Sequence, residues 1–212
     1  MHYKTQNIIE NDNIRFSIIL YADALPLYPE ENLSKADLQK YNRAKSRKRK
    51  LEIFYSSILW KTFGIQEEIK YSGLGSPELK TGHLSKSHCS QQVGILVSKN
   101  APFGIDLEAV DEKVHRVKNK FLHPDEEKRF ETDKTINLIR IWSIKEATFK
   151  FLKLSGVTFK EMLCVTSLDE NQGSIVVDHP DYRGVLAVKH WISQSNGMVY
   201  SLVGKPADIS KL

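Results

Sequence analysis

One segment decides how the rest of the sequence is interpreted: Ile141-Trp142-Ser143-Ile144-Lys145-Glu146-Ala147-Thr148-Phe149-Lys150. It is rich in helix-forming residues and contains no proline, and Ser155-Gly156 follows it, so we predict a helix from about Asn137 to this pair. One side of such a helix is mostly apolar, and we expect that side to be buried. Its members are Ile141, Ile144, Thr148, Phe151 and Leu152.

The opposite side of the predicted helix carries Trp142, Glu146 and Lys150 at i, i+4 and i+8. One interpretation is an exposed Glu–Lys pair, which stabilises a helix by only about 0.2–0.5 kcal/mol. The other is that both side chains belong to a functional site, together with acidic residues from elsewhere in the chain. Spacing alone favours the first interpretation.

An acidic segment earlier in the chain supports the second interpretation, that Glu146 and Lys150 belong to a functional site. In Gly104-Ile105-Asp106-Leu107-Glu108 the apolar and acidic residues alternate, so a strand places Asp106 and Glu108 on one face. Adjacent carboxylates repel unless a cation lies between them, and Mg²⁺ prefers oxygen ligands. With Glu146 as a third carboxylate the site would be complete, and Lys150 would meet a phosphate bound to the same metal. The alternative is an acidic strand edge that faces solvent.

Length and composition set wider limits. The chain has 212 residues, of which 41% are hydrophobic and 27% charged, as in ordinary globular proteins. Its net charge of +5 suits an acidic partner such as a phosphorylated cofactor, an acidic protein, an anionic membrane or nucleic acid. Cys89 and Cys164 do not make a disulfide framework, and there is neither a signal-like segment nor a membrane-length apolar run. We therefore expect a soluble, cytoplasmic, monomeric protein.

The order of elements predicts an α+β fold with two halves. Each half shows a strand, a short helix, a long helix and then several strands, so we expect two halves related by a pseudo-twofold axis. In each, a long helix would pack on a small antiparallel sheet. We place the N-terminal half at residues 1–102 and the C-terminal half, with the acidic strand, at residues 103–212. Strands are expected at residues 14–21, 68–71, 93–98, 104–110, 162–166, 174–177, 184–189 and 198–203.

A basic cluster and a lone histidine are further candidates for binding. Residues 43–50 hold six basic residues in eight and lead into apolar residues at helical spacing, so the cluster would form the first turns of a helix. It is either a solvated face or a surface for phosphate or an acidic partner. A nucleic-acid binder is another alternative, but interleaved aromatic residues and a nucleic-acid motif are missing. His88, in the polar stretch of residues 84–90, would present an imidazole to a phosphate, or is only a satisfied polar residue.

The two motifs together resemble a known family. Gly-Ile-Asp-x-Glu at residues 104–108, followed by Trp-Ser-x-Lys-Glu-Ala-x-x-Lys at residues 142–150, resembles the paired signature of the 4′-phosphopantetheinyl transferases. The closest resemblance is to the surfactin-synthetase-activating type, which has two fused halves. Ser87-His88-Cys89 stands where that family has Ser-His-Ser, and residues 121–127 match the helix before the second motif. The resemblance covers roughly residues 46–156.

The resemblance implies transfer of the phosphopantetheine arm of coenzyme A to a serine of an acidic acyl or peptidyl carrier protein. It assigns Asp106, Glu108 and Glu146 to Mg²⁺, with Mn²⁺ as an alternative ion. Glu146 would also accept the proton of the serine, and Lys150 would neutralise the phosphate under attack. The residues expected to contact coenzyme A are Ser87, His88, Lys145, Lys150, Arg47 and Arg49.

Two positions depart from the family pattern. Ser76, in Gly75-Ser76-Pro77, stands where the family usually has Lys or Arg, and Ser57 stands where it often has Arg. Each missing cation would weaken coenzyme A binding by about 1.5–3 kcal/mol, unless a nearby cation replaces it. The candidates are Arg47, Arg49, Lys80 and Lys86. The alternative function is a protein of the same fold that binds coenzyme A or a carrier protein with weak or lost turnover.

The segment after the long helix suggests a surface for the carrier protein. Apolar residues alternate there with Lys153 and Lys160, and an apolar patch ringed by lysines suits a helix with acidic residues around an apolar centre. The apolar residues are Leu154, Val157, Phe159 and Met162. The alternative, favoured for Met162, is that they begin the core of the second sheet.

Overall fold

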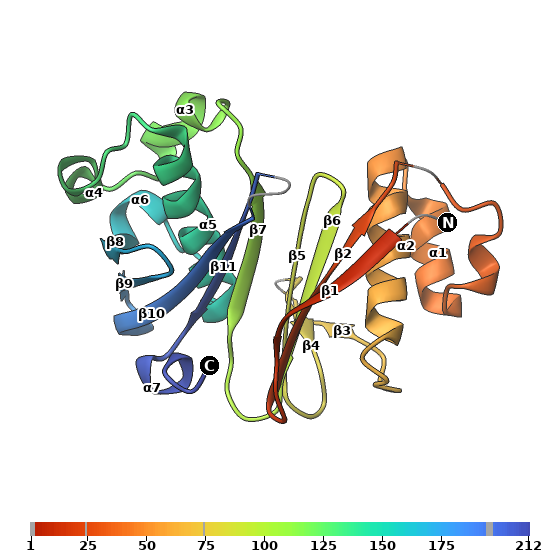
Figure 1. Cartoon of the computed structure of the whole chain (residues 1–212). Helices are drawn as coiled ribbons and strands as arrows, with labels where there is room; N and C mark the ends of the chain where they lie inside the picture. The colour runs from red at the N-terminus through yellow and green to blue at the C-terminus, as the bar shows by residue number, and fades with distance from the viewer. Residues whose placement is uncertain (1–2, 24, 74, 194–196) are drawn as a thin grey trace.

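The computed structural model describes residues 3–23, 25–73, 75–193 and 197–212. Each of its two larger sheets is covered on one face by a long helix, and the two sheets lie against each other through their remaining faces (Figure 1). The α+β prediction with two sheet-plus-helix halves is confirmed. No helix in the described part of the chain is long and apolar enough to cross a membrane.

The N-terminal sheet is antiparallel and has the strand order β1-β2-β6-β5. Helix α2 (Arg47–Lys61) packs on its outer face, and burial of Phe54, Tyr55 and Leu59 there holds the helix in place. The strands are β1 (Tyr3–Glu10), β2 (Ile14–Tyr21), β5 (His83–Cys89) and β6 (Gln92–Ser98). The remaining elements are η1 (Pro29–Glu31), α1 (Lys35–Arg43), β3 (Lys70–Tyr71) and β4 (Pro77–Glu78).

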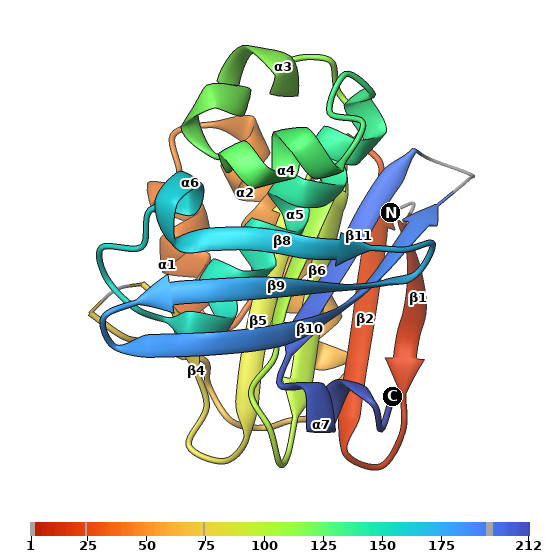
Figure 2. The same cartoon turned by 90° about the vertical axis from the view of Figure 1, so that its left-hand side faces the viewer.

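The C-terminal sheet is also antiparallel, with the strand order β7-β11-β10-β9-β8. Helix α5 (Thr135–Leu152) packs on its outer face, and in Figure 2 strands β8 to β10 run across the direction of β5, β6 and β2. The strands are β7 (Gly104–Ala109), β8 (Leu163–Leu168), β9 (Gln172–His179), β10 (Tyr182–Ser193) and β11 (Met198–Gly204). The remaining elements are α3 (Val114–Val117), η2 (Lys118–Lys120), α4 (Pro124–Arg129), α6 (Phe159–Met162) and α7 (Pro206–Ile209).

Side chains of β5 join the two sheets. The backbone N–H of Ile105 donates to Ser85 Oγ at 3.0 Å, and that of Leu107 donates to Ser87 Oγ at 3.2 Å. The N–H of Ala109 similarly approaches Cys89 Sγ at 3.3 Å. The edge of β7 is therefore satisfied by side chains of β5, which carries the Ser87-His88 stretch to the acidic strand.

Several predicted elements have different limits in the structure. The polar stretch before Val93 is itself a strand, β5, and β1 was not predicted. The basic cluster spans two helices, because Arg43 ends α1 and Ser46 caps the start of α2. Helix α5 ends at Leu152, before Ser155-Gly156, and is capped by Lys153, whose φ of 52° is left-handed. The boundary at residue 102 and the pseudo-twofold relation stay predictions.

Candidate active site

Helix α5 and strand β7 bring the predicted acidic residues and Lys150 to the junction of the two sheets. The packing is close, since a Cβ atom added at Gly104 would lie 1.9 Å from the carbonyl oxygen of Ala147. Only glycine permits this approach of helix to strand. Trp142 Nε1 donates to Glu108 Oε1 at 3.0 Å, which gives the tryptophan of the second motif a role in orienting the second carboxylate.

Asp106 is at the centre of a three-residue cluster. Its Oδ1 accepts from Lys150 Nζ at 2.6 Å and from Ser87 Oγ at 2.9 Å, while Lys150 Nζ also lies 2.9 Å from Ser87 Oγ. Only 2% of Asp106 is exposed. The surface Glu146–Lys150 pair is therefore not what the structure shows, because Lys150 pairs across to the strand.

The negative charge of the carboxylates around Lys150 is not fully balanced by hydrogen bonds and cations. Within the described residues, Asp106 Oδ2 is buried and has no hydrogen-bond partner. Burial, followed by the negative charge of Asp106, raises the pKa of Glu146 to about 7 and also raises the pKa of Glu108. The three acidic side chains thus lie close enough to oppose each other's ionisation.

These residues fit a divalent cation chemically. The unpartnered Oδ2 atom and the raised pKa values show a local excess of negative charge, and carboxylate oxygens are the ligands that Mg²⁺ and Mn²⁺ accept. The described residues hold no group of three or more His, Cys, Asp or Glu side chains already arranged as a metal site. The prediction that Asp106, Glu108 and Glu146 bind a metal therefore stays a prediction.

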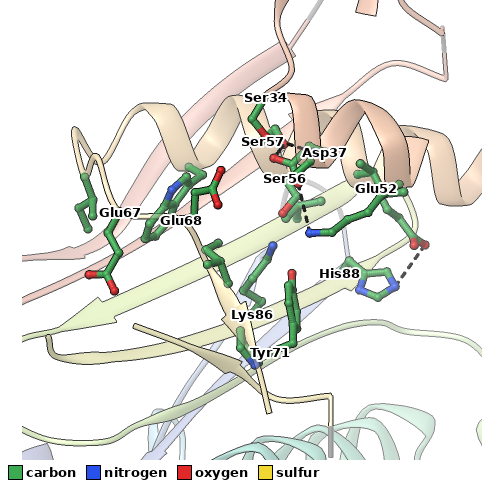
Figure 3. Close-up of a pocket in the computed structure, with 18 of the residues that line it drawn as sticks. Ser34, Asp37, Glu52, Ser56, Ser57, Glu67, Glu68, Tyr71, Lys86 and His88 are labelled. Atoms are coloured by element: carbon green, nitrogen blue, oxygen red, sulfur yellow. Dashed lines mark hydrogen bonds and ion pairs between the residues drawn. The ribbon is translucent and has the colours of Figure 1, made fainter. Parts of the chain in front are cut away.

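A pocket of about 500 Å³ lies in the N-terminal half and reaches this cluster. It lies between helices α1 and α2 and strands β4 and β5, and Ser87 and His88 both line it. Ser87 therefore belongs to the pocket and to the Asp106 cluster at once. Further lining residues are Asp37, Lys40, Arg49, Glu52, Ser57, Trp60, Tyr71, Pro77 and Lys86 (Figure 3).

The pocket is lined by both cationic and acidic side chains: Lys40, Arg49 and Lys86, and Asp37, Glu52, Glu67 and Glu68. In Figure 3 Lys86 points from β5 toward the helices that carry Asp37 and Ser57. Burial lowers the pKa of Lys86 to about 8, and in the described residues its ammonium makes neither a hydrogen bond nor an ion pair. Such a half-buried cation without an ion pair suits a phosphate ligand.

Glu52 organises two of the predicted binding residues. It accepts from Arg49 Nη1 at 3.1 Å and lies 3.2 Å from His88 Nε2. Burial lowers the pKa of His88, although Glu52 acts in the opposite direction. We did not assign Glu52 from the sequence, yet it is the acidic residue within the basic helix α2.

Three of the predicted contacts with coenzyme A do not line the pocket: Lys150, which nevertheless bonds to Ser87, and Lys145 and Arg47. Lys145 is fully buried and pairs with Glu126 at 2.8 Å inside the C-terminal half. Arg47 pairs with Asp23 at 2.9 Å on the surface and does not line the pocket. Neither of these last two positions supports a contact with a ligand in this pocket.

The two departures from the family pattern have distinct surroundings. Ser57 lines the pocket and its Oγ donates to Asp37 at 2.7 Å, so an acid stands near the position of the missing cation. The N–H of Ser76 donates to Ser72 Oγ at 3.2 Å in the turn beside β4.

Comparison with known proteins agrees with the position of this site. A search of the curated proteins finds no match for the chain. A protein-family model matches residues 102–202, the part that holds β7, α5 and β11. Asp106, Glu108, Glu146 and Lys150 thus lie in a segment that matches the 4′-phosphopantetheinyl transferase superfamily, whereas Ser87 and the pocket lie outside that segment.

Proposed function

We propose that this protein transfers the 4′-phosphopantetheine arm of coenzyme A to a serine hydroxyl of an apo carrier protein. The observation that carries the proposal is the double position of Ser87, which lines the pocket and bonds to the Asp106–Lys150 pair. A phosphate ligand in the pocket would extend toward that pair. We further propose that the chain is of the two-halved surfactin-synthetase-activating type and acts in the cytoplasm as a monomer.

The pocket would hold the anionic part of coenzyme A. Lys86 and His88 of β5 and Arg49 of α2 supply nitrogen donors in the pocket, and charge-assisted contacts with phosphate are worth about 1.5–3 kcal/mol each. Lys86 would replace the cations that are missing at Ser57 and Ser76. The pyrophosphate would then lie near Ser87, between the pocket and the acidic residues.

The chemistry is attack of the carrier serine on the phosphorus next to the pantetheine arm. The new bond joins the serine oxygen to phosphorus, the pyrophosphate P–O bond breaks, and adenosine 3′,5′-bisphosphate leaves with the electron pair. Glu146 would accept the serine proton, and Lys150 would neutralise the phosphate oxygens. Asp106, Glu108 and Glu146 would hold Mg²⁺, or Mn²⁺ in its place, and the bound ion supplies further neutralisation of the pyrophosphate.

The experiment that tests this function is incubation with coenzyme A, Mg²⁺ and a panel of apo carrier proteins, followed by mass spectrometry. We expect the added arm on at least one carrier, and its loss in excess chelator or in Asp106→Ala. Carriers from fatty-acid, polyketide and peptide synthesis all belong in the panel. Binding of coenzyme A without transfer to any carrier would instead support the alternative, a binding protein without turnover.

A further inference from the structure

Buried polar atoms without partners are concentrated beneath helix α5. Within the described residues, six buried side-chain nitrogen or oxygen atoms have no hydrogen-bond partner. One, Ser56 Oγ, lies in the N-terminal half. The others belong to the region between α5 and the C-terminal sheet, and they are Asp106 Oδ2, Arg140 Nε, Ser143 Oγ, His190 Nδ1 and Ser201 Oγ. Such atoms are rare in folded proteins, so their concentration here requires an explanation.

Three of these residues form one row across the sheet. In the strand register Asp106 of β7 pairs with Ser201 of β11, and Ser201 pairs with His190 of β10. Directly paired residues of antiparallel strands project from the same face with Cβ atoms about 4.5–5.5 Å apart. The row faces α5, because Lys150 contacts Asp106 at one end and Arg140 contacts His190 at the other. Figure 1 shows α5 against this face of β7 and β11.

The hydrogen-bonding capacities along the row are complementary. His190 Nε2 lies 2.9 Å from Arg140 Nη2, which can only donate, and 3.3 Å from the carbonyl oxygen of Gln172, which can only accept. We take the shorter contact to decide the tautomer, so that Nε2 accepts from Arg140. Burial, followed by the charge of Arg140, lowers the pKa of His190 to about 4, so the ring is neutral near pH 7. Its proton is then on Nδ1. The order along the row is a donor at His190, a hydroxyl at Ser201 that both accepts and donates, and an acceptor at Asp106 Oδ2.

We propose that His190, Ser201 and Asp106 form a continuous hydrogen-bonded row in which buried water bridges the gaps between the side chains. The row orients the carboxylate of Asp106 through its Oδ2 atom. A buried polar group without a hydrogen-bond partner destabilises the folded state, and water that bridges such groups is a regular part of protein interiors. Ser201 and His190 are thus positioning residues. They fix Asp106 Oδ2 while Ser87 and Lys150 fix Oδ1.

The consequence for metal binding rests on the proposed function. Residues that orient a metal ligand typically change metal affinity by about 10–100-fold when they are mutated. Neither Ser201 nor His190 would touch the metal or the substrate, so their effect would pass through Asp106.

The row itself is tested by ¹⁵N NMR of the histidine rings near pH 7, which requires no activity. We expect His190 as the neutral tautomer with its proton on Nδ1. His179 is an internal control, because its Nδ1 accepts from the N–H of Asp181 at 3.1 Å and its Nε2 faces the carbonyl of Ser155 at 3.1 Å. It should show the opposite tautomer. A proton on Nε2 of His190, or a charged ring, would overturn the proposal.

Metal affinity tests the positioning role. We expect Ser201→Ala to weaken Mn²⁺ binding by about 10–100-fold in calorimetric titration. Ser98→Ala is the matched control, since Ser98 is equally buried but lies in β6, and it should bind Mn²⁺ as the wild type does. His190→Asn, which keeps a nitrogen donor near the Nδ1 position, should retain more affinity than His190→Leu. Wild-type affinity in Ser201→Ala would overturn the positioning role. Absence of Mn²⁺ binding in the wild type would instead contradict the proposed function and leave the NMR test of the row intact.

Discussion

Helix α5 carries two lysines, Lys145 and Lys150, and each pairs with a carboxylate of another element. Lys145 Nζ lies 2.8 Å from Glu126, and neither side chain is exposed. Lys150 Nζ lies 2.6 Å from Asp106, but 25% of the Lys150 side chain is exposed. The pairs resemble each other in distance and differ in how completely their atoms are satisfied.

The pair of Lys145 and Glu126 is saturated. Lys145 Nζ also donates to the carbonyl oxygens of Phe121 and Phe159, at 2.6 and 3.0 Å. Glu126 accepts from the N–H groups of Val165 and His123, at 2.6 and 2.7 Å. These bonds tie α4, α6 and β8 to α5 and leave little capacity for a ligand. We infer that this pair is structural.

The pair of Lys150 and Asp106 is unsaturated. Asp106 Oδ2 has no direct partner in the described part of the chain, since the proposed row reaches it only through water, and 25% of the Lys150 side chain is exposed. A group with free hydrogen-bonding capacity next to a cavity can take up substrate or metal without breaking the fold. The two pairs of this helix differ in whether the hydrogen-bonding capacity of their atoms is filled. We infer that this property, more than burial or distance, distinguishes a structural ion pair from a functional one.

The largest expected effect comes from breaking the saturated pair. Lys145→Met should lower the free energy of unfolding by about 3–5 kcal/mol, because it leaves the charge of Glu126 buried without a counterion. Denaturant unfolding followed by circular dichroism measures it. Lys113→Met is a suitable control, since Lys113 pairs with Asp111 on the surface and should change stability by less than about 1 kcal/mol. Equal stability of the two variants would contradict the structural role of Lys145.

The next effect comes from breaking the unsaturated pair. Lys150→Met should lower kcat by about 10²–10³-fold, the typical loss when one electrostatic contact with developing charge is removed. Its effect on the free energy of unfolding in the presence of Mg²⁺ should be smaller than that of Lys145→Met, because Asp106 keeps Ser87 and the metal as partners. Single-turnover transfer and denaturant unfolding measure the two effects. A large loss of stability with unchanged kcat would reverse the roles that we assign to the two lysines.

A third lysine extends the comparison, because Lys86 is half-buried in the pocket lining and has no ion pair among the described residues. Lys86→Met should weaken coenzyme A binding by about 1.5–3 kcal/mol, or roughly 10–100-fold in Kd. Calorimetric titration measures it, with Lys80→Met as the control outside the pocket lining. Equal affinity of Lys86→Met and wild type would remove Lys86 from the coenzyme site.

The pKa of Lys86, lowered to about 8, adds a pH dependence to the same binding. The free ammonium loses its proton as pH rises through 8, whereas a bound phosphate favours the charged form, so affinity should fall as the pH rises from about 7 to 9. Lys86→Arg should reduce this fall, because a guanidinium stays charged throughout that range. Identical pH profiles for the two proteins would assign the dependence to another group.

The sequence predicted the residues of the site better than it predicted their partners. The alternation in β7 and the spacing in α5 indicated that Asp106, Glu108, Glu146 and Lys150 could face one another, and the structure brings them to one junction, because both periodicities follow from local geometry. Their roles stay predictions. The partner of Lys145 was not predictable in this way. Glu126 lies on a separate helix, and no local pattern shows that a Glu and a Lys will be buried together.

Strand β5 was missed for a related reason. Its alternate residues Ser85, Ser87 and Cys89 are polar or small, so they lack the apolar alternation that marks a buried strand. They face the edge of β7 and accept its N–H groups, an arrangement that depends on the second half of the chain. The row of His190, Ser201 and Asp106 also cannot be predicted from any local sequence pattern, because it depends on the register between β7, β11 and β10.

The smallest expected effect concerns the proposed docking surface for the carrier protein. Its lysines, Lys153 and Lys160, take no part in the ion pairs of Lys145 and Lys150. Phe159 packs near Trp142 and Phe149, at ring distances of 5.5 and 5.9 Å, and Phe149 is 40% exposed. Lys160 is in the same helix, α6, and Lys153 follows α5, with its Nζ 3.3 Å from the carbonyl of Pro77. This arrangement places positive charge beside an exposed aromatic side chain, as docking of an acidic helix requires.

Replacement of both lysines tests that surface. Lys153→Glu with Lys160→Glu should raise the KM for the carrier protein several-fold at low salt and less at high salt, since screening shortens the range of the attraction. The Kd for coenzyme A should stay unchanged, which separates this effect from that of Lys86→Met. Lys205→Glu with Lys211→Glu, which replaces two exposed lysines on either side of α7 near the C-terminus, gives a control with the same change of net charge. If the double variant and this control raise KM equally, the effect reflects net charge alone, and the carrier docks on another face.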